Sequence, residues 1–484
     1  MSFSSSLSLT WRTVCGIFTF EQHQDVTDQY PLTCEQRDTN RQVFIDSINQ
    51  DAVCALASRH NDQQPCRILY SDSGSFNVCF FVEFLTSRTK WVVRIPIEPV
   101  THDAWTKVRS EVMTMRHIES QTAIPLPRIR AYGRGERLVR DSPATQAYII
   151  LDFIPGRSLD LQALAKDTVP RRKYFYSQLI DVMAQLRQLE FTAAGSLMPA
   201  DDGGPDPAIG NLLSIPSNEL RIDCKEATPI STSTSAISFA LHQHRLMSES
   251  YRLPRSELSP QTAELELFAL DHLQQLIPEL ISSERVSGPF VLFHSDLRPT
   301  NIIVDDDLNI RSIIDWEWAY TVPQQLFMPP SWVTGQDLDY PTATDCQGAF
   351  PEFHEVLEEK AASSESYHQL ADAWGPDLPN TLILPLAQIL QHHSNLIRVY
   401  YKFIFPRFFQ EPRDKVLAQF FRGSSSESKN RGFEVQQRIA NSERYTQYLK
   451  DNGLFIPDEE AQMDREWLEK AKELQERFGI DSLK

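Results

Sequence analysis

The 484-residue chain lacks long apolar runs and has only seven cysteines and 17 glycines. No stretch approaches the ~20 apolar residues that a membrane-spanning helix needs, so no membrane partner is expected. The cysteines are scattered and form no Cys-x-x-Cys pair, which favours reduced thiols over disulfides or a zinc site. The first ten residues are rich in serine and lack a basic stretch before an apolar one. We therefore expect no secretory signal and a cytoplasmic protein.

Positive charge is also in deficit. The chain has 47 Lys and Arg against 65 Asp and Glu, a formal net charge of −18 at pH 7. A general nucleic-acid binder should have a basic face, so nucleic acid is not an expected partner. The acidic excess could attract a cationic substrate, but it also keeps a protein in solution, and we prefer the second interpretation. The length favours two or three lobes over one small core.

The most informative segment lies between residues 291 and 317. Residues 302–304 and 310–314 have the pattern of two short β-strands joined by a polar turn. An antiparallel pair of this kind places Asn301 and Asp315 at its open end, with their backbones only about 5 Å apart. An amide oxygen and a carboxylate at that spacing can reach one cation. Asp296, in the preceding loop, can point at a hydroxyl beside that cation.

The pattern His-x-Asp-x-x-x-x-Asn, followed by a strand and Ile-Asp-Trp, resembles the catalytic segment of the aminoglycoside phosphotransferase and choline kinase family. Members of this family are small-molecule kinases with a protein-kinase-like fold. The resemblance implies that Asp296 is the catalytic base and that Asn301 and Asp315 are magnesium ligands. His294 matches the histidine that holds the catalytic loop.

The loop departs from the family form, which resembles His-Gly-Asp-Leu-His-Pro-x-Asn, at two positions. Ser295 stands in place of the glycine, and Arg298 stands in place of the second histidine. Glu317 follows the metal aspartate by two residues, where it is either near the metal or, as we prefer, a surface or structural residue.

The acidic turn at residues 305–309 has a second interpretation as the start of a calcium loop. Ile310 occupies the position of the required glycine, and Trp316 occupies that of the bidentate glutamate, so the calcium interpretation fails. The three consecutive aspartates are better explained as a solvated turn between the two strands.

A phosphate-binding element is expected earlier in the chain. Two predicted strands flank the polar segment 71–77, which has Ser73, Gly74 and Ser75 at its centre. A loop of this composition can offer backbone N–H groups to phosphates. It contains one glycine, so an ordinary hairpin remains the alternative.

Arg94 lies on the next predicted strand, at the position where the resembling fold has its phosphate-pairing lysine. Arginine can bind phosphate with two N–H groups, but it is larger and planar, so the replacement is not conservative. Glu111, on the helix that follows, matches the family's helix glutamate and is expected to form an ion pair with Arg94. A solvated surface glutamate is the alternative.

An apolar strand ending at Pro155-Gly156 predicts a hinge between lobes. The resemblance implies that backbone groups of Asp152, Phe153 and Ile154 bind the purine of ATP or GTP. We expect an N-terminal arm at residues 1–38, a first lobe at 39–155 and a second lobe at 156–484.

The predicted fold is α+β and two-lobed, with a small antiparallel-sheet lobe and a larger, mainly helical lobe. Residues 41–59 and 171–189 have helical spacing, as does a C-terminal segment that includes Met463 and Trp467 behind the cap residue Asp458. Residues 200–260 contain loop-forming clusters and little periodicity, and residues 424–429 suggest a mobile loop.

Together these features predict a magnesium-dependent kinase that transfers the γ-phosphoryl group of ATP or GTP to a hydroxyl of a small molecule. The alternative is a nucleotide-binding pseudokinase or scaffold without turnover, which Arg94 and the glycine-poor loop favour. The intact set of Asp296, Asn301 and Asp315 favours the enzyme. No motif identifies the acceptor, and a fold leaves the substrate open.

Overall fold

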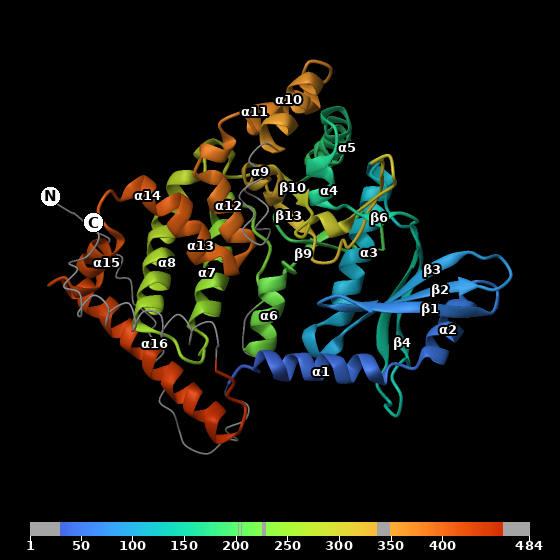
Figure 1. The fold of residues 1–484 in the computed structure, drawn as a ribbon, viewed down its shortest axis with the longest axis horizontal. Coiled ribbons are helices and arrows are strands. Elements are labelled where there is room, and N and C mark those ends of the chain that lie inside the picture. Colours follow the sequence, from blue (N-terminus) through green and yellow to red (C-terminus); the bar gives the residue numbers. More distant parts are fainter. Residues whose placement is uncertain (1–29, 202, 205, 225–228, 336–348, 458–484) are drawn as a thin grey trace, which may run out of the picture. The chain divides into compact units, whose positions relative to one another are not determined.

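A five-stranded antiparallel sheet forms the core of the smaller lobe (Figure 1). The computed structural model describes residues 30–201, 203–204, 206–224, 229–335 and 349–457. The strand order is β1-β2-β3-β5-β4. The strands are β1 (Cys66–Ser73), β2 (Asn77–Phe84), β3 (Lys90–Pro96), β4 (Ile129–Glu136) and β5 (Gln146–Asp152).

Three helices accompany this sheet: α1 (Cys34–Ser47), α2 (Gln50–Arg59) and α3 (Ala104–Gln121). The single helix predicted over residues 41–59 is in fact two, because Asn49 caps α2 by accepting hydrogen bonds from the backbone N–H groups of Asp51 and Ala52. The boundary expected at residue 38 falls inside α1.

The inner strand β5, between β3 and β4, contributes to two hydrophobic cores. Tyr148 and Ile150 belong to the core between the sheet and α2, whereas Ala147, Ile149 and Leu151 face α3 and the core of the larger lobe. Successive side chains of a strand point to opposite faces, so a strand buried on both faces has no polar alternation. This explains the near-continuous apolar run that the sequence has here.

The larger lobe is mainly helical. Its longer helices are α5 (Val169–Gln188), α6 (Ile215–Asp223), α7 (Ala236–Arg252), α8 (Pro260–Leu280), α10 (Ala349–Ala361), α11 (Glu365–Ala373), α12 (Ile383–Gln391), α15 (Arg413–Arg422) and α16 (Ser426–Asp451). With the antiparallel sheet, this composition confirms the predicted α+β fold class. No helix within the described residues is long and apolar enough to cross a membrane.

One expectation for this lobe was incomplete and another was wrong. Residues 200–260 contain the expected loops, but they also contain α6 and the 17-residue α7, whose buried face mixes His, Gln and Ala with larger apolar residues. The loop expected at 424–429 ends early, because Ser425 caps α16 by accepting from the backbone N–H of Ser428. The predicted C-terminal helix around Met463 lies outside the described residues.

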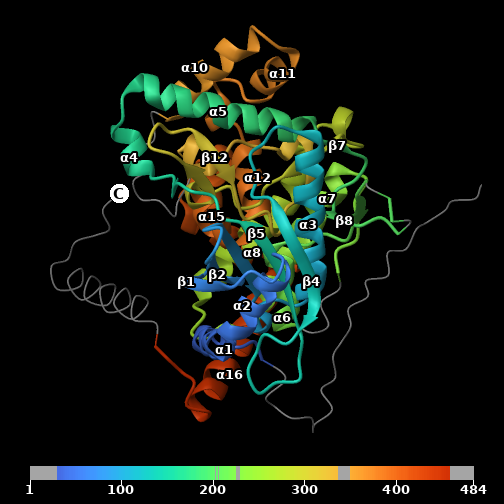
Figure 2. The same ribbon diagram turned by 90° about the vertical axis from the view of Figure 1, so that its right-hand side faces the viewer.

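The segment of residues 291–317, which resembles a kinase catalytic segment, folds as the spacing predicts. β11 (Ile302–Val304) and β12 (Ile310–Ile313) form an antiparallel hairpin in which Ile302 faces Ile313. The backbone N–H of Ile314 donates to the Asn301 carbonyl over 3.0 Å, so pairing continues to the open end. Helix α5 lies against this hairpin (Figure 2), where Gln178 bonds the backbone of both Leu308 and Ile310.

Gly156 connects the sheet to this hairpin. Directly after it, β6 (Arg157–Ser158) pairs with β11, so the chain leaving the hinge is attached to the catalytic hairpin. Gly156 has φ +147°, and a Cβ there would lie 2.7 Å from the Val304 carbonyl oxygen and the Ile303 side chain. Glycine is therefore required both by the backbone conformation and by the space available.

Gly156→Ala should lower the free energy of unfolding by more than about 2 kcal/mol, because it adds a clash with backbone to the strain of a positive φ. Gly135→Ala is the matched control, because Gly135 also has a positive φ (+97°) but open space around it. Urea denaturation of both variants measures the difference. Equal losses would mean that the close approach to β11 contributes nothing.

Candidate active site

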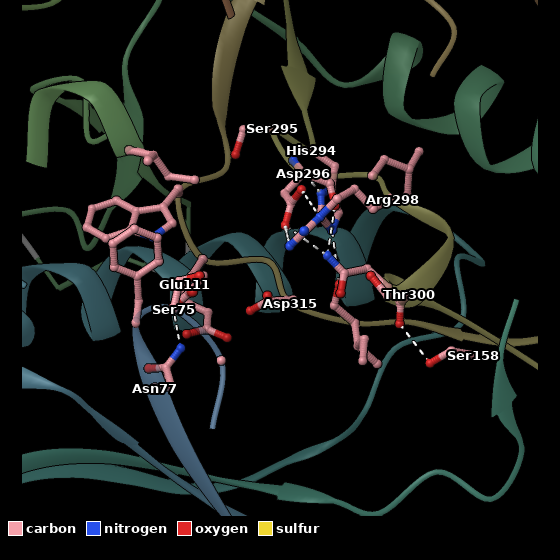
Figure 3. A pocket seen from close by; sticks show the side chains of 18 of the residues that line it. Ser75, Asn77, Glu111, Ser158, His294, Ser295, Asp296, Arg298, Thr300 and Asp315 are labelled. Atoms are coloured by element: carbon pink, nitrogen blue, oxygen red, sulfur yellow. Dashed lines mark hydrogen bonds and ion pairs between the residues drawn. The ribbon is translucent and has the colours of Figure 1, made fainter. Parts of the chain in front are cut away.

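A cavity of about 1160 Å³ lies between the sheet, the catalytic hairpin and α12. Figure 3 shows Glu111, Asp296 and Asp315 around this cavity. Every residue predicted for the site lines it except Ser73. Ser73 was predicted in the phosphate loop, but β1 continues through it and its N–H is bonded to the Asp72 side chain, so that expectation was wrong.

His294 holds the catalytic loop, as predicted. Its Nε2 lies 3.0 Å from the Ile314 carbonyl oxygen, and its Nδ1 accepts from the backbone N–H of Asp296 over 3.2 Å. Burial lowers the pKa of His294, so the ring is neutral at pH 7. The neutral ring then has one N–H, at Nε2, which donates to Ile314 and joins the loop to the end of β12.

The Asp296 carboxylate is fixed by two neighbours. Arg298 contacts both of its oxygens, at 2.5 Å from Nε and 2.7 Å from a terminal nitrogen. The Asn301 amide nitrogen donates to the Asp296 carbonyl over 2.8 Å and to its carboxylate over 3.2 Å. From the sequence, Arg298 was noted only as the replacement of a histidine. The structure shows that it orients Asp296 through a two-point contact.

Arg94 forms the predicted ion pair with Glu111, at 2.6 Å, and a second with Asp315, also at 2.6 Å. The guanidinium is buried, and burial alone would lower its pKa. The charges of Glu111, Asp315 and Glu317 outweigh that effect, so the pKa of Arg94 is raised well above its ordinary value. Arg94 is thus a permanent positive charge that connects α3 to the end of β12.

Asp315 and Asn301 are suitable ligands for a magnesium ion. Asp315 has φ +66°, a strained backbone conformation for a residue other than glycine, and such strain is typical of functional sites. The Asn301 side-chain nitrogen donates to the Asp296 carbonyl of the loop, so the side-chain oxygen of Asn301 points away from that carbonyl. Two oxygen ligands suit magnesium, which completes its shell with phosphate oxygens and water.

A second buried cation, which the sequence did not reveal, lies behind this pair. The Lys107 side chain contacts the Glu317 carboxylate and donates to the Asn77 amide oxygen over 2.9 Å. Asn77 also donates to Glu317 over 2.5 Å. Glu317 is therefore buried and lines the cavity, and it does not lie on the surface. Lys107 precedes Glu111 by one helical turn, which is the only local signal for its position.

The expected phosphate hairpin is shorter than predicted. Strand β1 extends through Ser73 and strand β2 begins at Asn77, so the loop contains only residues 74–76. The Gly74 N–H is bonded to the Asn77 carbonyl, and the Gly74 carbonyl accepts from Arg41 of α1 over 2.6 Å. The loop N–H groups left for a phosphate are those of Ser75 and Phe76.

Two of the three backbone N–H groups expected to bind a purine at the hinge are also already hydrogen-bonded within the protein. The N–H of Asp152 donates to the Arg128 carbonyl, and the N–H of Phe153 donates to the Lys90 carbonyl. The Asp152 carboxylate is paired with Arg130. Of the three residues expected to bind a purine through their backbone, Ile154 therefore has the amide most readily available.

Comparison with known proteins identifies the class. The model of the phosphotransferase enzyme family matches residues 75–321, just over half of the chain. The match begins within the hairpin loop, at Ser75, and includes Arg94, Glu111 and all of residues 291–317. The chain belongs to this family, and its two-lobed, kinase-like α+β architecture is the one that the resemblance implied.

More distant similarity extends to individual proteins. The chain is 23% identical over 322 residues to altered inheritance of mitochondria protein 9, mitochondrial, of Saccharomyces cerevisiae (strain YJM789), covering 56% of this chain and 50% of that protein. It is 25% identical over 241 residues to clavilactone A biosynthesis cluster protein Y of Ampulloclitocybe clavipes, covering 49% and 55%. The chain spans about half the length of the curated relatives it matches.

Among solved structures, the chain is similar to Plasmodium vivax ethanolamine kinase, with a TM-score of 0.43 and 12% identity. That match covers 85% of this chain and 96% of the other. A microcompartment-associated aminopropanol kinase gives a TM-score of 0.41 at 14% identity, covering 84% and 99%.

Lys107→Met should lower the free energy of unfolding by about 3 kcal/mol, because it leaves the buried Glu317 carboxylate without its closest cation. Arg67→Met is the control, since Arg67 is half exposed in its pair with Glu83 and should contribute less than about 1 kcal/mol. Chemical denaturation measures both. The double variant Lys107→Met with Glu317→Leu should recover part of the loss, and no recovery would contradict the pairing.

Proposed function

We propose that the chain is a magnesium-dependent kinase that transfers the γ-phosphoryl group of ATP or GTP to a hydroxyl of a small molecule. The observation that supports this most directly is the convergence of Asp296, Asn301, Asp315 and Arg94 on one cavity. These residues come from the catalytic loop, the hairpin and the sheet. Family membership supports phosphoryl transfer in general, and the remaining details are our proposal.

Asp296 would orient the acceptor hydroxyl and accept its proton late, once the oxygen is bonding to phosphorus. Arg298 would hold the Asp296 carboxylate in a fixed orientation toward the substrate. Asn301 and Asp315 would hold magnesium, which neutralises phosphate charge when bound. In this chemistry, positioning and charge stabilisation supply most of the rate.

Arg94 would bind the nucleotide phosphates from the sheet side, held in place by Glu111. The purine would lie at the hinge, near Phe153 and Ile154, and the short loop at Gly74 and Ser75 would cover the phosphates. A cytoplasmic location remains a prediction, and the yeast relative is named as a mitochondrial protein.

One observation favours the alternative of a nucleotide-binding protein without turnover. Arg94 already pairs with Asp315, the proposed metal ligand, at 2.6 Å. A fixed cation on that carboxylate competes with magnesium, so the pair must open or share the carboxylate before a metal binds. Turnover and nucleotide binding must therefore be measured separately.

Asp296→Asn should lower kcat by about 100-fold or more, because it removes the proton acceptor, while the Kd for Mg·ATP stays within about threefold. ADP or GDP release with an acceptor mixture measures turnover, and calorimetry measures binding. Asp306→Asn is the matched control, because Asp306 lies fully exposed in the turn of the hairpin. A wild-type protein that binds Mg·ATP but shows no turnover with any acceptor would support the alternative.

Asp315→Asn should remove the magnesium dependence of nucleotide binding, because it takes away the charged metal ligand. Calorimetric titration with ATP and GTP, with and without Mg²⁺, should show at least tenfold tighter binding with Mg²⁺ in the wild type and nearly equal binding in the variant. A wild-type protein that is folded but binds neither nucleotide would overturn the proposed function.

A further inference from the structure

Gln388 is a buried amide without a partner on the wall of the cavity. It lies on α12 with 7% of its surface exposed, and it lines the same cavity as Asp296. Neither its Nε2 nor its Oε1 has a hydrogen-bond partner. Burying an unpaired amide is costly, and buried polar groups are nearly always bonded. The position of Gln388 therefore indicates a polar partner that arrives from the cavity.

The wall formed by α12 adjoins the catalytic loop. Gln391 of α12 donates to the Leu326 carbonyl over 3.2 Å. The next residue, Phe327, lines the cavity and packs edge-on against Phe293, with ring centres 6.3 Å apart. Phe293 immediately precedes His294. A molecule in contact with Gln388 is thus on the same side of the cavity as the proposed base.

Ser295 provides a second, independent observation. Its hydroxyl is shielded from solvent and has no hydrogen-bond partner, and the residue lines the cavity directly before Asp296 (Figure 3). The family form has glycine here, so this hydroxyl is an addition at the place where an acceptor meets the base. Two unpaired polar groups therefore flank the acceptor end of the cavity.

The chemistry of this wall distinguishes between ligand classes. A carboxamide donates through Nε2 and accepts through Oε1. An ammonium group can satisfy only Oε1, and a carboxylate only Nε2, whereas neighbouring hydroxyls satisfy both. Of the other polar groups on this side of the cavity, Gln391, Ser394 and Asn395 are uncharged and His392 is titratable, while Phe327 and Trp332 add apolar surface. The Trp332 indole N–H is already bonded to the Leu297 carbonyl, so its ring offers an apolar surface.

On the basis of the proposed kinase function, we infer that the acceptor is a neutral polyhydroxy compound. Gln388 binds hydroxyls beside the one that is phosphorylated. Ser295 binds the acceptor next to Asp296. The competing class is a cationic amino alcohol, for which Glu219 of α6 is the candidate carboxylate, because it also lines the cavity. The two classes make opposite predictions for Gln388 and Glu219.

The test uses the full chain with saturating Mg·ATP and measures ADP release. Glycerol, D-glucose and myo-inositol represent neutral polyols, and ethanolamine and choline represent amino alcohols. At least one polyol should stimulate release, and Gln388→Leu should raise its KM about tenfold with less than a twofold change in kcat. Ser295→Gly should also raise that KM. Gln436→Leu, on the exposed face of α16, is the matched control and should leave KM unchanged.

Thermal unfolding separates binding from structure. Because the amide is unpaired, the nearly isosteric Gln388→Leu should keep or raise the Tm, and a fall of several degrees would assign Gln388 a structural partner and overturn the inference. Stimulation by amino alcohols alone, lost in Glu219→Gln, would also overturn it. If Mg·ATP binds but no polyol stimulates release, the inference fails and the proposed function stands. If Mg·ATP does not bind, the proposed function itself fails.

Discussion

The buried guanidinium of Arg94 is the charge on which the arrangement of the site depends. It lies on β3 and reaches Glu111 of α3 in one direction and Asp315, beyond β12, in the other, each at 2.6 Å. A charge taken out of water is stable only when paired with good geometry. The fold therefore cannot place β3 without also placing α3 and the end of the catalytic hairpin. The positive φ of Asp315 is compatible with this constraint, since the ion pair contributes to holding a strained backbone.

The charges around Arg94 do not balance. Arg94 and Lys107 are two cations, whereas Glu111, Asp315 and Glu317 are three carboxylates in the same network. Lys107 and Asn77 satisfy Glu317, so the remaining negative charge falls on the side of Asp315, the most exposed of the three carboxylates. A divalent cation beside Asp315 would reverse the sign of the local charge and prepare the site for phosphate. Under the proposed function, the imbalance favours metal and nucleotide binding together over either one alone.

The sequence predicted the parts of the site that depend on local spacing. The hairpin and the placement of Asn301 and Asp315 follow from strand pattern and turn composition along nearby segments, whereas the pairing of Arg94 with Glu111 was expected from the family resemblance. The contact between Asn77 and Glu317 joins residues 240 positions apart, and no periodicity encodes such a distance. Gln388 was not predicted either, because its significance lies in the absence of a hydrogen-bond partner, which no sequence pattern shows. Helix α7 was missed because its buried face includes Gln243 and His244, which have no apolar signature.

The contacts between the two lobes differ widely in strength, and this difference bears on how the cavity can open. Helix α1 reaches both lobes, through Arg41 to the Gly74 carbonyl and through Arg37 to Asp223 of α6, but these contacts are partly exposed. Exposed pairs contribute little and are screened by salt. The contacts of Arg94 and Lys107 with the segment after β12 are buried and much harder to break. The buried contacts therefore join β3, α3 and the segment after β12 into one unit. Under the proposed function, any opening of the cavity would leave this unit together, so a nucleotide would meet a charged framework that is already in place.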